Sequence, residues 1–313
     1  MLNRRHIRIK VMQSIYAMHQ HQSDSLDKEE KFLFHSIESM KDLYLLMLSA
    51  LIEIRLKEEE YLELASKKHL ATKEERNPNK KFVNNAVLNF LAQSDVISQA
   101  IEDEKINNWK RNDDVILFLL EAIKESDLYQ DYMAKPLGSF NDEKYFIADL
   151  FTEVIAPNEK LYDYLEDYKL TWLDDLPLVN TFILKQIKGL KSVEDSFKVT
   201  KLYKDEDDQD FVKNLFRKTV LNEQELSKEY IDKTPNWDAD RIAEIDTIIL
   251  KMAICELLKF PSIPAKVTIN EYLEIAKEYS TPKSSIFING ILDNLVKDFQ
   301  NNNRLLKTGR GLL

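Results

Sequence analysis

The start of the chain concentrates positive charge in one short segment. Residues 1–10 carry no acidic side chain and hold five basic ones: Arg4, Arg5, His6, Arg8 and Lys10. Guanidinium and ammonium groups are the side chains that most often contact the phosphates of nucleic acids. A neighbouring histidine can stack on a base or simply face solvent. The segment is therefore a candidate for binding a phosphate-rich partner, and the alternative is a solvated basic end without a ligand.

These basic residues are expected to lie on a helix. Apolar side chains recur at helical spacing through residues 3–20: Ile7, Val11, Ile15 and Met18. The stripe predicts an amphipathic helix that carries Arg4, Arg5 and Arg8 away from its apolar face. Cations at a helix start are disfavoured by the helix dipole, by roughly a few tenths of a kcal/mol each. An anionic ligand explains this arrangement better than helix stability does.

The sequence lacks the usual signatures of catalytic and metal sites. It contains no glycine-rich phosphate loop, no G-x-S-x-G and no H-E-x-x-H. The single cysteine, Cys255, lies on an apolar helical stripe, which predicts a buried, unreactive thiol and excludes an internal disulfide. His19 and His21 have no third ligand nearby, and every histidine precedes residue 70. We therefore predict no catalytic residue, no metal site and no cofactor.

The composition predicts an all-α protein. The 313 residues include only 5 glycines and 8 prolines, so few turns interrupt long helices. The net charge of −10 describes an acidic body, but a basic segment can still bind RNA because charges are screened beyond about 10 Å. The most apolar run, residues 43–54, is too short to span a bilayer. We expect a cytoplasmic protein with no membrane contact.

Breaks in the helical pattern divide the chain. Long helices are predicted for residues 29–66, 82–103 and 112–134, with a loop at 70–81 and a strong break at 135–138. The predicted segments are a basic first helix at 1–20, an additional helical segment at 29–134, a further segment at 140–190, a C-terminal part at 205–302 and a flexible tail at 303–313.

A weak internal repeat relates two of these segments. Residues 142–190 match residues 207–255 at a constant offset of 65. The identical pairs are Asp142/Asp207, Phe146/Phe211, Leu150/Leu215, Phe151/Phe216, Leu161/Leu226, Trp172/Trp237, Asp175/Asp240 and Ile183/Ile248. The paired tryptophans at corresponding corners favour a duplicated three-helix unit. The alternative is coincident helical periodicity.

The stretch Ile263–Phe299 predicts two helices joined by a tight corner. Pro282 ends the first helix because proline cannot continue it, and Thr281 can cap the second. Gly290 lies inside the second helix, where glycine costs about 1 kcal/mol relative to alanine. This glycine indicates either the close approach of another backbone or a residue that is merely tolerated.

Several stretches resemble one protein family. AKVTINEYLEIAKEYS and SSIFINGILDNL look like the C-terminal signature of the NusB family of bacterial transcription antitermination factors. Residues 242–257 are similar to the helix that precedes this signature. The opening MLNRRHIRIKVMQSIYAMHQ resembles the arginine-rich first helix of the family. The resemblance covers roughly residues 1–20 and 205–300, and the middle of the chain has no such match.

The resemblance implies a fold of helical bundles and a role in transcription. NusB proteins bind boxA-type single-stranded RNA of ribosomal RNA transcripts together with the ribosomal protein NusE, and act on the RNA polymerase elongation complex with other Nus factors. On this basis Arg4, Arg5, Arg8 and Lys10 are expected to contact phosphates. By position in the matching motif, Phe287 and Asn289 are candidates for the base-facing edge, although Phe287 could instead be a core aromatic.

The resemblance also points to a partner surface formed by Glu256, Lys283 and Ser284. Family members commonly carry an acidic residue where this chain has Lys283. The NusE contact therefore cannot be carried over charge for charge, and the lysine could meet RNA or a differently charged partner.

Two other functions remain open from the sequence. The acidic middle of the chain favours a non-catalytic helical scaffold for protein interactions without specific RNA binding. NusB-like domains also occur attached to ribosomal RNA methyltransferases, but no glycine-rich cofactor loop is present here.

Overall fold

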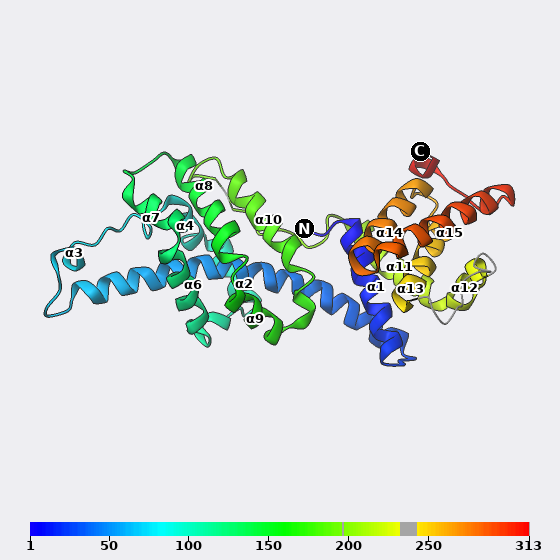
Figure 1. The fold of residues 1–313 in the computed structure, drawn as a ribbon, viewed down its shortest axis with the longest axis horizontal. Helices are drawn as coiled ribbons and strands as arrows, with labels where there is room; N and C mark the ends of the chain where they lie inside the picture. Colours follow the sequence, from blue (N-terminus) through cyan, green and yellow to red (C-terminus); the bar gives the residue numbers. More distant parts are fainter. Residues whose placement is uncertain (196, 232–242, 313) are drawn as a thin grey trace. The chain divides into compact units, whose positions relative to one another are not determined.

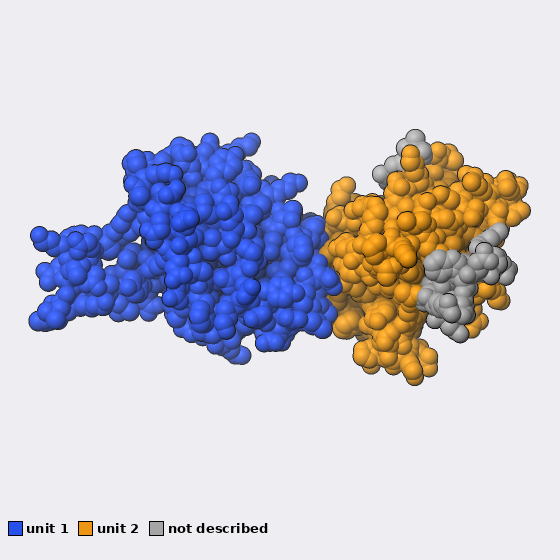
Figure 2. Space-filling view, viewed as in Figure 1, with its two compact units in different colours: residues 1, 38–202 blue, residues 2–37, 203–313 orange. Residues whose placement is uncertain are grey.

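The computed structural model of the chain describes residues 1–195, 197–231 and 243–312, and every regular element in these ranges is helical (Figure 1). The predicted all-α class is confirmed. The chain forms two compact units (Figure 2). Unit 1 consists of residues 1 and 38–202, and unit 2 of residues 2–37 and 203–313. Unit 2 is thus built from the two ends of the chain and unit 1 from its middle. Among the described helices, none is both long and apolar enough to cross a membrane.

Unit 1 is organised around α2, Leu26–Ser66, whose residues from 38 onward belong to it. The elements that follow in unit 1 are α3 Lys73–Arg76, α4 Ala86–Ala92, α5 Asp95–Asp103, η1 Asn108–Lys110, α6 Asp113–Glu125, α7 Asp127–Ala134, α8 Phe140–Leu150, a π-helical turn η2 Phe151–Ile155, α9 Glu159–Tyr168, η3 Leu170–Trp172 and α10 Leu176–Gly189. The predicted segments 29–134 and 140–190 therefore fall largely within one unit.

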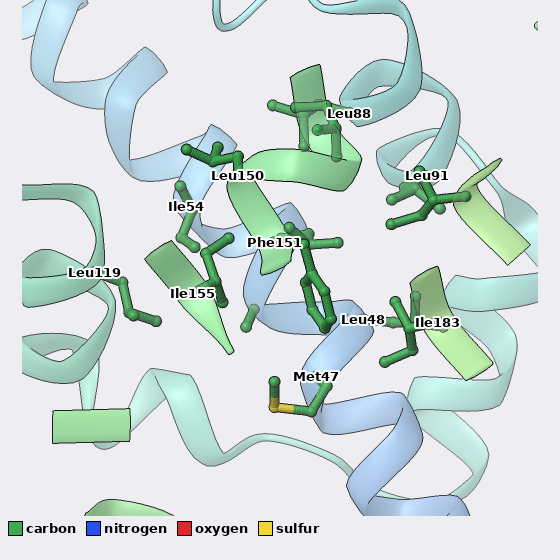
Figure 3. Packing of buried hydrophobic residues seen from close by; sticks show 14 of the residues in the cluster. Met47, Leu48, Ile54, Leu88, Leu91, Leu119, Leu150, Phe151, Ile155 and Ile183 are labelled. Atoms are coloured by element: carbon green, nitrogen blue, oxygen red, sulfur yellow. The ribbon is translucent and has the colours of Figure 1, made fainter. Parts of the chain in front are cut away.

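The core of unit 1 surrounds the middle of α2. Residues 43–48 are all fully buried, so this helix is apolar on every side and must be covered all round. Figure 3 shows Met47 and Leu48 of α2 packed beside Phe151 and Ile155 of the π-helical turn, with Ile183 of α10 close by. The long apolar run in the sequence is thus a buried core helix.

Two helices predicted as continuous are each divided in the structure. The 82–103 segment forms α4 and α5, and the 112–134 segment forms α6 and α7. The cause is a serine at each division. The Ser94 hydroxyl accepts the Ile97 N–H at 3.4 Å, and the Ser126 hydroxyl accepts the Tyr129 N–H at 3.2 Å. Each serine therefore caps a new helix start, where it is more favourable than in a helix interior.

Unit 2 has the basic first helix at its centre. Its described helices are α1 Arg4–Gln20, the first part of α2, α11 Glu206–Leu221, α12 Glu223–Ile231, α13 Glu244–Lys259, α14 Ala265–Tyr279, α15 Pro282–Asn301 and η5 Gly309–Leu312. Helix α1 packs against α11, α13 and α14. The two ends of the sequence that resemble NusB therefore fold into the same unit.

The predicted corner between residues 263 and 299 is present as the α14–α15 hairpin. Thr281 has the extended conformation of an N-cap, and Pro282 is the first residue of α15. A Cβ atom added at Gly290 would meet no atom within 4 Å. The close backbone approach suggested by this glycine is therefore not found within the described chain, and Gly290 is a tolerated residue on an exposed surface.

The end of the chain differs from the expected flexible tail. The Thr308 N–H donates to the Pro261 carbonyl at 3.0 Å, and Lys307 Nζ donates to the Phe260 carbonyl at 3.1 Å. Gly311 lies so close to this loop that an added Cβ would be 2.0 Å from the Pro261 oxygen. These contacts attach the tail to the C-terminal end of α13, where unpaired carbonyls need donors.

The helices of the proposed repeat follow one another in the same order in both copies. Helices α8, α9 and α10 correspond in sequence to α11, α12 and α13, and the two sets belong to different units. Trp237 and Asp240 lie outside the described residues, so the corner that favoured a duplication cannot be compared. The duplication stays a prediction.

Candidate nucleic-acid interface

Arg4 and Arg5 lie at the start of α1 with partly exposed side chains. The helix begins after Asn3, whose side chain accepts the His6 N–H at 2.8 Å. The Arg4 side chain is 41% exposed and that of Arg5 is 42% exposed. Both guanidinium groups can therefore be reached from solvent, as contact with a phosphate requires.

Both exposed arginines already have carboxylate partners. Arg4 Nε donates to Asp208 Oδ1 at 2.7 Å, and its guanidinium lies 4.5 Å from the centre of the Phe211 ring. Arg5 donates through Nη2 and Nε to the two oxygens of Glu271, at 2.9 and 3.0 Å. The hydrogen bond that Arg5 donates to Glu271 raises the pKa of Arg5 above its ordinary value. The start of α1 is therefore basic but partly neutralised within the protein.

Arg8 is buried, in contrast to the surface position expected from the helical pattern. Its side chain is 2% exposed, and it donates to both oxygens of Glu256 at 2.7 and 2.8 Å. The Glu256 carboxylate also accepts from Thr268 Oγ1 at 2.8 Å and from the Tyr272 hydroxyl at 3.3 Å. Burial by itself lowers the pKa of Arg8, but the charge and hydrogen bonds of Glu256 hold that pKa above its ordinary value. Arg8 is thus a paired core residue.

His6 and Lys10 are also buried, with 6% and 2% of their surface exposed. The expected division of α1 into an apolar face and a basic face is therefore wrong over its first turns. The physical reason is the position of the helix, because α11, α13 and α14 cover it together. Of the five basic residues proposed to meet RNA, only Arg4 and Arg5 present their charged groups to solvent in this structure.

The two candidates for the base-facing edge lie on α15. Phe287 is half-buried, and Asn289 donates through Nδ2 to Asp293 Oδ2 at 3.1 Å. Asn289 and Asp293 line a groove of about 640 Å³, with Lys266, Ile269 and other residues of α14, α15 and the tail along it. Amide and carboxylate groups in such a groove can donate and accept hydrogen bonds.

The residues assigned to a partner surface do not form one. Glu256 is fully buried and pairs with Arg8. Ser284 is 5% exposed, and its hydroxyl donates to Asp246 Oδ2 at 2.7 Å. Lys283 is exposed. Of these three residues, only Lys283 is placed to meet another molecule.

A charged cluster around His19 was not foreseen as a unit. His19 Nε2 lies 3.0 Å from Glu223 Oε1, and His19 Nδ1 lies 3.0 Å from Glu244 Oε1. Lys251 also pairs with Glu223. The hydrogen bond from His19 and the nearby lysine lower the pKa of Glu223 to about 2, and the hydrogen bond that His19 donates to Glu223 raises the pKa of His19. The cluster connects α1 to α12 and α13.

Comparisons with known proteins place this arrangement in a family. The family model described as "NusB family" matches residues 180–297, which include α11 to α14 and most of α15. The Transcription antitermination protein NusB of Salinibacter ruber is 48% identical over 113 residues, which cover 36% of this chain and 70% of that protein. The chain belongs to the NusB family.

Two further NusB proteins match over shorter parts of their length. The Transcription antitermination protein NusB of Chloroherpeton thalassium is 40% identical over 104 residues, 33% of this chain and 49% of that protein. The one of Natranaerobius thermophilus is 45% identical over 84 residues, 26% of this chain and 60% of that protein. No solved structure matches the chain significantly. The NusB family model begins at residue 180, so it leaves out nearly all of unit 1.

The long-range ion pairs of this NusB-family chain could not have been found from sequence spacing. A separation of 225 residues lies between His19 and its partner Glu244, and one of 248 residues lies between Arg8 and Glu256. The one available signal was chemical. Arg8 and Lys10 alternate with apolar residues on both sides, so some of the charge had to face the protein interior once the helix was covered.

Proposed function

We propose that this chain is an RNA-binding transcription antitermination factor. It would bind boxA-type single-stranded RNA of ribosomal RNA transcripts together with NusE, and act on the RNA polymerase elongation complex with other Nus factors. Membership of the NusB family and the two solvent-accessible arginines at the start of α1 support this proposal. The proposal requires no catalytic step.

Arg4 and Arg5 are the proposed phosphate contacts. Their partly exposed guanidinium groups are on the same turn, so consecutive phosphates of a single strand can approach them. Phe287 and Asn289 on α15 remain proposed contacts to bases, through stacking and through the amide group. Lys283, exposed at the α14–α15 corner, is proposed to meet the partner protein or the RNA. We propose that Arg8 and Glu256 act indirectly, by fixing α1 in place.

Fluorescence anisotropy with labelled RNA tests this proposal. A boxA-like strand and a scrambled strand would be titrated with the full chain, with and without NusE. The Arg4→Ala/Arg5→Ala variant should bind boxA RNA more weakly. In a plot of log K against log[salt], the slope for this variant should be shallower by about 1.4, because each phosphate contact contributes about 0.7 for single strands. The matched control is Lys110→Ala/Arg111→Ala, which removes two exposed cations of unit 1. Equal effects of both pairs would contradict a site on α1.

A protein-interaction scaffold is the alternative function. Unit 1 favours it, because this unit lies almost wholly outside the family match and exposes large apolar side chains, including Leu70 at 88% and Leu137 at 75%. Single exposed apolar residues are common on protein surfaces, so this observation carries less weight than the family. A scaffold would show no RNA affinity even at low salt, whereas a phosphate-led interface weakens steeply as salt rises.

A further inference from the structure

The two proposed phosphate-binding arginines are held by carboxylates in the structure. Arg4 donates to Asp208 of α11, and Arg5 binds both oxygens of Glu271 of α14. A phosphate would take hydrogen bonds from the same guanidinium N–H groups, since carboxylate and phosphate both match the guanidinium fork. RNA and these two carboxylates therefore compete for the same donors.

The exposures show which partner of each pair can move. The Asp208 side chain is 8% exposed, whereas that of Arg4 is 41% exposed. The Glu271 side chain is 22% exposed, whereas that of Arg5 is 42% exposed. In both pairs the acid is the more enclosed member and the arginine the more exposed one. An arginine can therefore turn outward to a phosphate while the acid stays where the fold places it.

Each carboxylate keeps favourable electrostatics after its arginine leaves. Asp208 lies in the first turn of α11, where the positive end of the helix dipole stabilises an anion. Glu271 Oε2 lies 3.7 Å from Nη1 of the buried Arg8, so a second cation remains beside it. Each acid thus keeps one favourable interaction, the helix dipole for Asp208 and the Arg8 cation for Glu271, which lowers the cost of release.

We propose that Asp208 and Glu271 act as internal substitutes for phosphate, which hold Arg4 and Arg5 in the free protein and set its affinity for RNA. This inference rests on the proposed RNA-binding function. RNA binding then exchanges two internal ion pairs for two phosphate contacts. The acidic partners thereby lower the affinity for every strand that depends on these two arginines.

The test measures RNA affinity of full-chain variants by fluorescence anisotropy at low and moderate salt. Asp208→Asn and Glu271→Gln keep size and hydrogen bonding but remove the competing charge. Partly exposed ion pairs are worth little, so each variant should bind a boxA-like single strand roughly two- to five-fold more tightly. The double variant should bind about ten-fold more tightly. Asp207→Asn is the matched control, since Asp207 is an exposed neighbour in the same turn.

The same substitutions are then combined with Arg4→Ala/Arg5→Ala. The inference predicts that the gain disappears in this background, whereas a general effect of net charge would persist. One outcome separates the inference from the proposed function. If the wild-type protein binds RNA and the arginine variant does not, the proposed function stands. If Asp208→Asn and Glu271→Gln then bind no more tightly than Asp207→Asn, the inference about the two carboxylates is overturned. If no protein in the series binds RNA at low salt, both are overturned. Should Asp208→Asn lose its helical circular dichroism, Glu271→Gln within α14 decides the question.

Discussion

The buried pair between Arg8 and Glu256 offers a sharp prediction about stability. Substituting Glu256→Ala removes the carboxylate that both guanidinium hydrogen bonds use, in a place where the two side chains are 2% and 0% exposed. Burial lowers the pKa of Arg8, and removing Glu256 removes the main interaction that raises that pKa, but a guanidinium is effectively never deprotonated in a protein, so Arg8 stays charged. Unit 2 would then contain a buried charge without its hydrogen-bonded partner, and only the more distant Glu271 carboxylate, 3.7 Å from Arg8 Nη1, would remain beside it.

The expected cost follows from that burial. Breaking a buried ion pair by removing one partner costs about 3–5 kcal/mol, which is roughly a 10²- to 10⁴-fold change in an equilibrium constant. The hydroxyls of Thr268 and Tyr272 lose the same acceptor and add to the cost. The double variant Arg8→Met/Glu256→Met should be less destabilised than Glu256→Ala, because it removes both charges from the interior.

Hydrogen–deuterium exchange read by peptide is the suitable assay, because it reports on each unit of the chain separately. In Glu256→Ala, peptides of α1, α13 and α14 should exchange faster, and peptides of α6 and α8 should not change. Arg5→Ala is the control, since it breaks a half-exposed pair with Glu271 and should cost less than about 1 kcal/mol. If Glu256→Ala and Arg5→Ala had the same small effect, the Arg8–Glu256 pair would not be the buried contact described here.

Three further predictions concern a titrating cluster, the tail and a helix cap. The hydrogen bond to Glu223 raises the pKa of His19 above its ordinary value of 6.5, so the stabilising charge of His19 is present below pH 6.5 and is lost as the pH rises through the higher folded-state pKa. The difference in unfolding free energy between wild type and His19→Gln should therefore shrink over that pH window in denaturant titrations. In Gly311→Ala, the added methyl would collide with the Pro261 carbonyl, so exchange of residues 304–312 should accelerate while α1 stays protected, and unchanged tail exchange would contradict the docked tail. Ser126→Ala removes the N-cap of α7 and should lower the free energy of unfolding by about 1 kcal/mol, which the midpoint of urea unfolding of unit 1 would show. The control is Ser98→Ala, because Ser98 is exposed and caps no helix.

The helices of this protein can be predicted well from the sequence, except where a serine caps a new helix within a continuous apolar stripe. Periodicity predicted a helix at 29–66, and the structure has Leu26–Ser66. The same periodicity continued through Ser94 and Ser126, because a polar residue on one helical turn does not disturb an apolar stripe. Their side chains nevertheless cap new helices. Recognition of the NusB family was confirmed by the comparisons, whose family model covers the C-terminal motif.

The candidate site was harder to predict, because exposure is a tertiary property. Arg4, Arg5 and Arg8 look alike in the sequence, yet only the first two reach solvent. The difference arises from Glu256, which is placed beside Arg8 only when α13 packs on α1. Spacing along α1 cannot contain that information. The same limit applied to Glu256 itself, whose motif suggested a surface role although its carboxylate lies in the interior.

The division of unit 2 between the two ends of the chain has a consequence for folding during synthesis. Helix α1 is made first, but the elements that cover it begin at residue 206, and Glu256 follows Arg8 by 248 residues. At about 5–20 residues per second, the first helix waits roughly 10–50 s for its partners. Residues 38–202 can meanwhile fold as a unit, which shortens the effective loop between α1 and its partners. The saving in loop-closure entropy is modest, about 0.6 kcal/mol for each halving of the loop length. The nascent chain thus exposes a basic, half-apolar helix for much of its synthesis, which makes this segment a natural substrate for chaperones.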